Sequence, residues 1–499
     1  MRGSGRKGVL CLLASLACAS LSLPSTRDAT PDPLILLQRY LRIDTSNPPG
    51  GEAAAALFFK ELLEEHGIPA SIHEVAPGRA NVLARLKGSA GGEGSRRALL
   101  LFNHMDVVQA DPNRWSVPPF SAQVRDGYLY GRGTLDMKTT GLLQALALIR
   151  LKEEGVPIAR DVIFLGTAGE EAGSEGMRWM IEHQPGLFAQ VELALTEGDN
   201  IRIENGRTQA WGVDVAEKVT AWMKLTAFGV AGHASVPTGE GNPVVRLVRA
   251  LERLSRHETP LRVLPSVAAY YAALADRTPD LPASKLRALD SSLREDPRFR
   301  AAFLSSPDRA ATVRDTISIT VLQGGPQTNV IPSTAVAHLD CRLLPGSDPS
   351  AFAEEIQRII GDPNITVEPL IEAREATASD TDSALYRAIE AAARRFEPGV
   401  PVVPSLLTSW TESSLLRPLG IDSYGFEPYA LDDREVSLSH SDDERISLEN
   451  VRTGFEILYA IVREAAAPPP SRAASPSPAG WDPPGPTPSR RIASGRFGD

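Results

Sequence analysis

Apolar and polar residues follow two different periods along this chain, and the periods predict alternating helices and strands. Residues 52–66 and 139–154 carry apolar side chains at the spacing of an amphipathic helix, and a glycine follows each segment. Residues 98–104 and 162–168 are predicted to be strands, and the apolar run 162–168 is typical of a buried strand. Strands separated by helices predict an α/β domain with a mostly parallel sheet, which binds its ligands at the carboxyl ends of the strands.

The pattern changes near residue 216. Residues 216–338 contain alternating strands, an amphipathic helix and a polar, proline-containing stretch, which together predict a compact α+β unit. Beyond this unit, helical and strand segments alternate as before. We therefore predict one α/β domain in two parts, residues 28–215 and 339–464, which is interrupted by an inserted α+β domain.

The two ends of the chain differ in composition from the middle. Residues 1–27 begin with basic residues and continue with an apolar stretch that is short for a membrane span and rich in small residues. This pattern predicts a signal peptide and export to the periplasm or the outside. An uncleaved anchor and a lipid anchor on Cys18 are the alternatives. Residues 465–499 are rich in proline and serine, which predicts a disordered tail.

Charge and cysteine content narrow the classes of function. The chain has 52 Lys and Arg against 62 Asp and Glu, a formal net charge of -10, which argues against a nucleic-acid partner. Its three cysteines, Cys11, Cys18 and Cys341, cannot build a disulfide framework and exclude a zinc site made of cysteine pairs. Any metal must therefore be held by histidine and carboxylate side chains.

Side chains that can bind metal follow several of the predicted strands. Each of five separate segments supplies a histidine or a carboxylate: residues 103–106, 131–138, 169–173, 196–199 and 439–444. Because the strand ends of an α/β sheet meet at one edge, we expect these side chains to converge. Two histidines with several carboxylates form a mixed nitrogen and oxygen set, which suits Zn²⁺, Mn²⁺ or Co²⁺ better than Ca²⁺.

Two pairs of neighbouring residues indicate specific roles at such a site. His104 and Asp106 are two positions apart on a strand, so both leave the same face and the carboxylate can orient the imidazole. Glu170 and Glu171 point in different directions, so one can bind a metal while the other takes a proton from water. Each feature alone has a structural explanation: a chance histidine, a solvated acidic turn or, for Asp136, a helix N-cap. The argument depends on their joint occurrence.

Eight short motifs occur in order along the chain: NHMDVV, YGRGTLDMK, TAGEEAGSEG, LTEGD, GHAS, TNVIP, DCRLLPG and SHSDDERI. From about residue 33 to 463 the chain resembles the aminoacylase / carboxypeptidase S / glutamate carboxypeptidase family of dinuclear metallopeptidases. Its inserted unit is most similar to the carboxypeptidase S and N-acyl-amino-acid hydrolase branch. The resemblance implies a zinc-exopeptidase-like α/β catalytic domain with an inserted α+β domain that serves as a lid or for dimerisation.

The resemblance also implies a ligand set for two divalent cations. One cation would be held by His104, Asp136 and Glu197. The other would be held by Asp136, Glu171 and His440, so that Asp136 bridges the two. We expect zinc at both positions, with cobalt or manganese as alternatives.

Further residues would act in the reaction or support the ligands. Glu170 would be the general base and then the general acid, and Asp106 would orient His104. The peptide bond between Asp136 and Met137 is expected to be cis.

Three residues match positions that contact the substrate in the family. His233 would stabilise the oxyanion, often from the lid of a dimer partner, and Asn329 and Arg342 would contact the oxyanion and the substrate carboxylate. Alternatively, His233 is a turn residue and Arg342 a surface arginine. The chain departs from the family at Thr196, where an acidic residue is usual, and at residues 409–413, which line the substrate end, so specificity stays open.

The predicted reaction is hydrolysis of the amide bond of an N-acyl amino acid or a short peptide with a free carboxylate. The inserted domain would either form a homodimer or act as a monomeric lid. Two other functions stay open here. One is an exported binding protein without activity, which should have lost metal ligands, and the other is a desuccinylase-like biosynthetic enzyme, against which the predicted export weighs.

Overall fold

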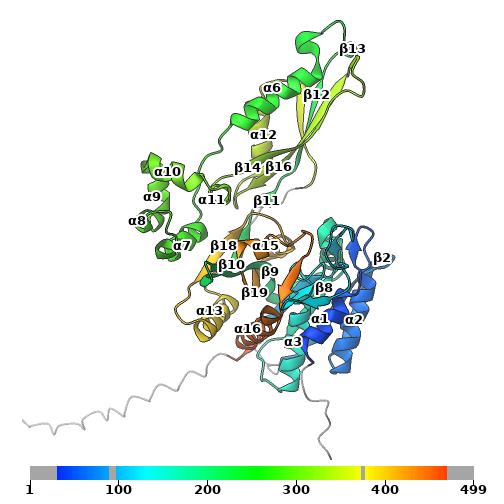
Figure 1. The fold of residues 1–499 in the computed structure, drawn as a ribbon, viewed down its shortest axis with the longest axis vertical. Helices are drawn as coiled ribbons and strands as arrows, with labels where there is room; N and C mark the ends of the chain where they lie inside the picture. Colours follow the sequence, from blue (N-terminus) through cyan, green and yellow to red (C-terminus); the bar gives the residue numbers. More distant parts are fainter. Residues whose placement is uncertain (1–30, 89–96, 373–376, 469–499) are drawn as a thin grey trace, which may run out of the picture.

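The computed structural model describes residues 31–88, 97–372 and 377–468. The predicted signal peptide, Cys18 and nearly all of the predicted tail lie outside the described residues. Within these ranges, no helix combines the length and the apolar composition that crossing a bilayer requires. The molecule is elongated, with a large sheet and its helices at one end and a smaller sheet with its own helices at the other (Figure 1).

The large sheet has eight strands, and the strands at its centre are parallel. In spatial order they are β18 (Val402–Leu407), β10 (Arg207–Glu217), β19 (Asp422–Leu431), β9 (Val191–Glu204), β4 (Ala98–His104), β8 (Val162–Thr167), β3 (Arg79–Leu86) and β2 (Ala70–Ala76). β4 pairs in parallel with β8 and β9, and β9 pairs in parallel with β19, whereas β3 and β2 are antiparallel at one edge. This mixed sheet with a parallel centre confirms the predicted α/β domain.

Helices cover both faces of this sheet, and the side chains of β4 show why its first five residues are all apolar. Leu99 and Leu101 share a core with α1 (Pro33–Leu41), α2 (Glu52–Glu65), α3 (Lys138–Glu153) and α16 (Leu448–Ala466). Leu100 and Phe102 point to the opposite face, where they pack with α4 (Glu175–His183) and α14 (Ser413–Leu416). Successive strand residues point to opposite faces of the sheet. In a strand that is covered on both faces, the residues of both faces are therefore apolar.

The smaller sheet forms the inserted domain and has five strands. They are β11 (Val219–Thr220), β12 (Met223–Phe228), β14 (Thr316–Gln323), β16 (Thr334–Leu343) and β17 (Ile365–Pro369). Two helices, α6 (Pro243–Arg256) and α12 (Pro349–Ile360), share one hydrophobic core with the sheet, in which Leu225, Leu247 and Ile356 are fully buried. The insertion therefore has the predicted α+β character.

The predicted end of the inserted domain at residue 338 is wrong. That boundary lies inside β16, which pairs with β12 and β14. Farther along the chain, β17 also pairs with β12, so the domain continues to Pro369. Helix α12 and strand β17 alternate as they would in the α/β domain, and periodicity alone does not show which sheet a strand joins.

A helical segment inside the insertion packs on the catalytic domain instead. It runs from α7 (Pro265–Ala273) to α11 (Pro307–Thr312) and includes the polar stretch of the sequence. Tyr271 and Phe303 belong to the same core as the catalytic helices, and α7 lies against β18. The side chain of Arg202 on β9 donates a hydrogen bond of 2.7 Å to the Tyr270 hydroxyl. The inserted sequence is thus divided between the two ends of the molecule, rather than forming one unit as predicted.

Candidate active site

Five chain segments place charged side chains at one edge of the catalytic sheet. His104 ends β4, Glu171 follows β8, and Glu197 lies in β9 just past its parallel pairing with β4. Asp136 lies two residues before α3, and His440 lies between α15 (Asp433–Val436) and β20 (Arg445–Ser447). The carboxyl ends of parallel strands and the loops beside them therefore meet, as the sequence predicted.

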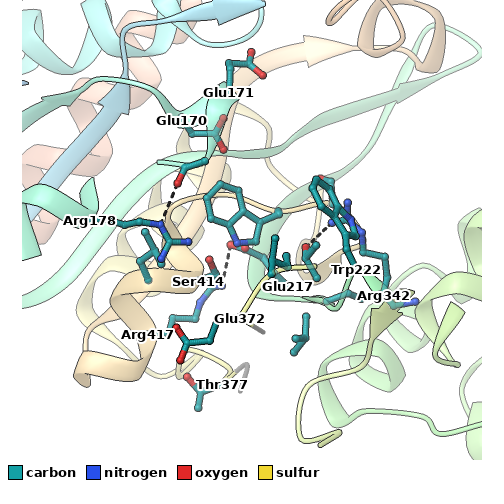
Figure 2. Close-up of a pocket in the computed structure, with 18 of the residues that line it drawn as sticks. Glu170, Glu171, Arg178, Glu217, Trp222, Arg342, Glu372, Thr377, Ser414 and Arg417 are labelled. Atoms are coloured by element: carbon teal, nitrogen blue, oxygen red, sulfur yellow. Dashed lines mark hydrogen bonds and ion pairs between the residues drawn. The ribbon is translucent and has the colours of Figure 1, made fainter. Parts of the chain in front are cut away.

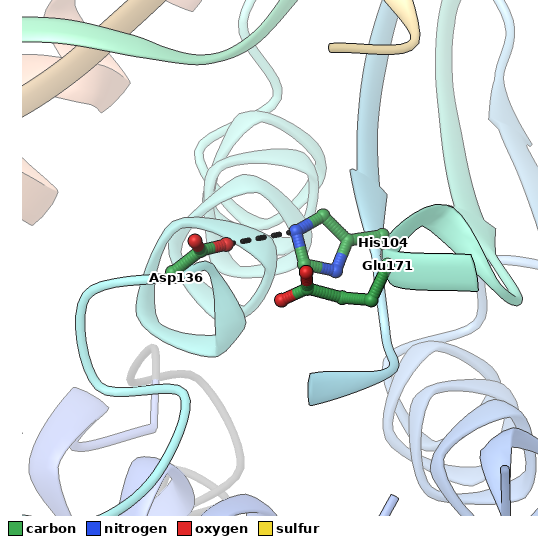
Figure 3. A group of neighbouring side chains, drawn as sticks. All are labelled: His104, Asp136 and Glu171. Carbon is green, nitrogen blue, oxygen red and sulfur yellow. Dashed lines mark hydrogen bonds and ion pairs between the residues drawn. The ribbon is translucent and has the colours of Figure 1, made fainter. Parts of the chain in front are cut away.

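Asp136 lies between the two imidazoles. Its Oδ1 is 3.0 Å from His104 Nε2, and its Oδ2 is 3.0 Å from His440 Nε2. On the first side, Glu197 Oε2 is 3.3 Å from His104 Nε2, and on the second, Glu171 Oε1 is 3.0 Å from His440 Nε2. Figure 3 shows His104, Asp136 and Glu171, whose ligand atoms lie within 4.8 Å of one another. The five predicted ligands thus form two groups that share Asp136.

These side chains fit two divalent cations. Each group offers one imidazole nitrogen and carboxylate oxygens, the mixed donors that Zn²⁺ and similar ions bind. The carboxylates also repel one another. Burial, opposed by His104 and reinforced by the charges of Asp136 and Glu171, raises the pKa of Glu197 above its usual range. Positive ions between these oxygens would remove that repulsion.

Asp106 shapes the loop that follows β8. Its carboxylate accepts hydrogen bonds of 3.0 to 3.2 Å from the backbone N–H groups of residues 169–171, and one of 2.9 Å from the Asn47 side chain. His104 Nδ1 is 3.0 Å from the backbone oxygen of Asp106 but 3.5 Å from its carboxylate. The nearest acceptor for the imidazole is therefore the main-chain carbonyl, rather than the carboxylate that the sequence suggested.

Glu444, whose role the sequence does not indicate, organises the loop that ends at Asp136. Its buried carboxylate accepts hydrogen bonds from the backbone N–H groups of Gly133 at 3.0 Å and Asp136 at 3.3 Å. It also forms an ion pair of 2.6 Å with Arg132, whose guanidinium donates to the His440 carbonyl at 3.2 Å. Its place four residues after a ligand histidine was the one signal in the sequence.

Glu170 lines a cavity beside the cluster (Figure 2). Burial raises its pKa, and the Glu197 carboxylate adds to this against the opposing charge of His104. Glu412, on the loop after β18, is a second residue whose role the sequence does not indicate. Its buried carboxylate accepts a hydrogen bond of 2.7 Å from the Thr167 hydroxyl, and burial raises its pKa to about 7.

The cavity has a volume of about 700 Å³ and is lined by residues of both domains. Glu170, Glu171 and His440 line it, so the cavity reaches the cluster. Along its walls, Trp410 and Arg417 come from the catalytic domain, and Trp222 and Arg342 come from the inserted domain. Figure 2 shows Arg342 and Trp222 on one side of the cavity and Arg417 near Glu217 across from them. Apolar surface together with charged groups of both signs suits an amphipathic ligand.

The structure does not bring His233 and Asn329 to the cluster. His233 is exposed and belongs to β13 (Gly232–His233), which pairs with β15 (Val330–Ile331) at the far tip of the inserted domain (Figure 1). Asn329 lies beside it, because its carbonyl accepts a hydrogen bond of 3.0 Å from the backbone N–H of Ala234. Arg342 does line the cavity, but its guanidinium is already paired with Asp340 at 2.7 Å.

Comparison with known proteins identifies the family. A family model described as peptidase family M20/M25/M40 matches residues 100–464, well over half of the chain. The chain belongs to this family. An N-fatty-acyl-amino acid synthase/hydrolase of Xenopus tropicalis is 29% identical to it, over 79% of this chain and 76% of that protein. Aminoacylase-1 of Homo sapiens is 26% identical, over 87% of this chain and 95% of that protein.

Among solved structures, an M20 family metallo-carboxypeptidase from Sulfolobus solfataricus shares the fold. It covers 87% of this chain and 99% of its own, with a TM-score of 0.67 and 19% sequence identity. This likeness confirms the predicted fold class, and the Asp136–Met137 peptide bond is cis, as expected. This M20 chain is a metal-dependent hydrolase of amide bonds. The chain keeps all five residues expected as metal ligands, whereas a binding protein without activity should have lost some of them.

Proposed function

We propose that this M20 hydrolase cleaves N-acyl amino acids, releasing a carboxylic acid and an amino acid. The observation that carries the proposal is the position of Asp136, 3.0 Å from each of two imidazoles at the end of an amphipathic cavity. The names of two relatives, an N-fatty-acyl-amino acid synthase/hydrolase and an aminoacylase, favour the same substrate class. Short peptides with a free carboxylate are the second candidate, because a metallo-carboxypeptidase shares the fold.

Each side chain at the cluster has a defined part in this reaction. His104, Asp136 and Glu197 would hold one divalent cation, and Asp136, Glu171 and His440 would hold another, for which we propose zinc. Such ions would supply Lewis acidity for the carbonyl and for water. Glu170 accepts the proton of the attacking water while the water oxygen bonds to the carbonyl carbon. It then gives this proton to the nitrogen as the carbon–nitrogen bond breaks. The backbone contacts of Asp106 hold Glu170 in place.

We propose that His233 and Asn329 act at the site of a second copy of the chain. The backbone N–H of Ser235 donates to His233 Nδ1 at 3.2 Å, so the neutral imidazole carries its hydrogen on Nε2 and can donate it to an oxyanion. Val230 and Val236 in the same part of the domain are 64% and 71% exposed. A contact with a second copy would bury such apolar side chains.

Mixing two variants tests this dimer. Glu170→Ala removes the proton acceptor, and His233→Ala removes the oxyanion donor. In a mixed dimer, one site then has both groups intact if His233 acts across the interface. We expect activity to return when the two variants are coexpressed and to be low in each variant alone. A monomeric lid would give no recovery, and light scattering would show one copy.

The substrate class is tested with metal-loaded protein. It is offered N-acetyl, N-octanoyl and N-palmitoyl derivatives of several amino acids beside a set of dipeptides, and release of free amine is measured. We expect hydrolysis of the acyl amino acids. Cleavage of the dipeptides alone would favour the second candidate, and no release from any of them would overturn the proposal.

We also propose that the protein is exported, on the composition of residues 1–27. Sequencing the amino terminus of the mature protein tests this. A new terminus within or just after this segment is expected, and a lipid-modified Cys18 would be found as the alternative. A chain that keeps Met1 in the cytoplasm would contradict export.

A further inference from the structure

We propose that Arg79 is a positioning residue for Glu170, because it fixes the loop that carries this general base. The inference rests on the proposed function, in which Glu170 takes and then returns the proton. Arg79 is the first residue of β3, the strand beside β8, and the loop that follows β8 is formed by residues 168–174. A side chain that holds this loop acts on the base without touching the substrate.

The pairing of β3 with β8 brings Arg79 to this loop. The two strands are antiparallel, and Val82 lies opposite Gly166. Continuing this register by three residues on each strand places Arg79 opposite Gly169, the residue before Glu170. Gly169 has a φ of 76°, and a β-carbon at this position would collide with Arg79 Nη2. The guanidinium therefore packs directly against the backbone of the loop.

Two acidic side chains hold the guanidinium in this position. Arg79 Nη2 lies 3.2 Å from Glu52 Oε1, and Arg79 Nε donates to Glu52 Oε2 at 3.3 Å. Arg79 Nη1 forms an ion pair with Glu175. Glu52 is fully buried at the start of α2, whereas Glu175 is exposed at the start of α4. A two-point contact with a buried carboxylate fixes the plane of the guanidinium, and with it the surface on which the loop rests.

The loop is also held by two other side chains, which leave a separate part to Arg79. Asn81 lies two positions after Arg79 and therefore on the same face of β3. Its side chain accepts a hydrogen bond from the Ala168 backbone N–H and donates one to the Gly176 carbonyl, both at 2.9 Å. Asn81 thus holds the two ends of the loop, and Asp106 binds the N–H groups between them. The guanidinium fills the space beside the α-carbon that precedes the base.

Loss of this contact should lower turnover rather than substrate affinity. A general base works only within hydrogen-bond reach of the proton that it takes. A misplacement of about 1 Å can cost about 10²-fold in rate. Arg79→Gln shortens the side chain and removes its charge, so the loop gains freedom next to Gly169. The same substitution leaves Glu52 buried without its partner, which destabilises the fold as well.

The test separates turnover from stability by a second substitution. Arg79→Gln is compared with Arg79→Gln/Glu52→Gln, in which the buried carboxylate is also removed. N-octanoyl-phenylalanine is the substrate, and saturating metal offsets any weaker binding at Glu171. We expect the melting temperature to fall in the single variant and to recover most of this loss in the double variant. In both variants kcat should stay about 10–100-fold below that of the wild type, with KM nearly unchanged.

The matched control is Arg85→Gln at the other end of β3, where it breaks an ion pair of 3.2 Å with Asp161. This variant should keep the kcat of the wild type. A kcat in the double variant that recovers together with the melting temperature would show that Arg79 acts on stability alone and would overturn the inference. A kcat that does not fall in either variant would overturn it too.

Hydrogen exchange separates this inference from the proposed function, because it needs no substrate. The exchange rate of the backbone N–H groups of residues 169–171 is measured by mass spectrometry on metal-loaded wild type, Arg79→Gln/Glu52→Gln and Arg85→Gln. Exchange that is faster by about tenfold in the double variant alone supports the role of Arg79, even if no acyl amino acid is hydrolysed. Exchange at the wild-type rate in the double variant contradicts this role, whatever the substrate.

Discussion

The candidate catalytic residues are clustered at one end of the molecule, whereas at the other end they are exposed and far from that cluster. At the edge of the catalytic sheet, five side chains from separate segments lie within 3.3 Å of a neighbour in one cluster. At the tip of the inserted domain, His233 and Asn329 are exposed and lie far from that cluster (Figure 1). A single chain therefore brings together the five candidate metal ligands, whereas in our proposal the oxyanion donor comes from a second copy.

Glu170→Ala changes the end of the molecule that carries the cluster of candidate metal ligands, and it should have the largest effect. Turnover is expected to fall by about 10²–10⁴, the contribution of a positioned general base. Elemental analysis should find the metal content of the wild type, because Glu170 is not one of the five ligands. Glu182→Ala, on the exposed side of α4, is the matched control and should keep full turnover. Full activity in Glu170→Ala would remove this residue from the mechanism.

His233→Ala changes the distant end. Turnover is expected to fall by about 10²–10³, the usual loss for one oxyanion donor, with the metal content unchanged. Ser235→Ala removes the hydroxyl that lies 2.6 Å from His233 Nδ1 but keeps the backbone donor, so its effect should be milder. If His233→Ala turns over as fast as the wild type, the tip has no part in catalysis and the comparison loses its functional meaning.

Glu444→Gln tests the residue that holds the loop ending at Asp136 in place. The affinity for metal should fall about 10–100-fold, as is typical when a group that orients a ligand is lost, because the amide cannot neutralise Arg132. Asp443→Asn makes the same change of charge one residue away, where the carboxylate contacts Ser116 at 2.7 Å. Competition with a chelator measures both. An equal loss in the two variants would show that charge alone matters.

Glu412→Gln should have the smallest effect, and this effect should appear in how the stability of the protein depends on pH. Burial raises the pKa of Glu412 from its ordinary value of 4.5 to about 7 in the folded protein. The folded state therefore binds the proton of Glu412 more tightly than the unfolded state does. The stabilisation of the folded state by this proton is complete below the pKa of the unfolded state, and it is lost as the pH rises through about 7. Chemical denaturation of the chelator-treated wild type should show that the free energy of unfolding decreases by up to about 3 kcal/mol from pH 4 to 8. An equal decrease in Glu412→Gln would contradict this prediction.

How much of the fold and of the candidate site the sequence predicts depends on whether the interacting residues are close together in the sequence. His104 and Asp136 stand at a strand end and before a helix, where a short motif identifies them. Glu444 acts on the backbone of Gly133, 311 positions earlier, and Glu412 on Thr167, 245 positions earlier. No periodicity reveals contacts between such distant residues, so these roles needed the structure.

Two features of the fold were missed for different reasons. Strand β10 follows a turn at Asn205 and Gly206, both with positive φ, and an Asn-Gly pair between strands is a strong hairpin signal that the sequence contained. The packing of α7 to α11 on the catalytic domain had no such signal, because amphipathic helices do not specify which surface they cover. Domain membership is decided by tertiary packing.

The central claim is that Asp136 joins two cations. Anomalous diffraction from crystals of the metal-loaded protein measures this most directly. We predict two peaks on either side of the Asp136 carboxylate, one in contact with His104 and Glu197 and the other with Glu171 and His440. A single peak, or peaks that leave either histidine without a metal, would contradict the account.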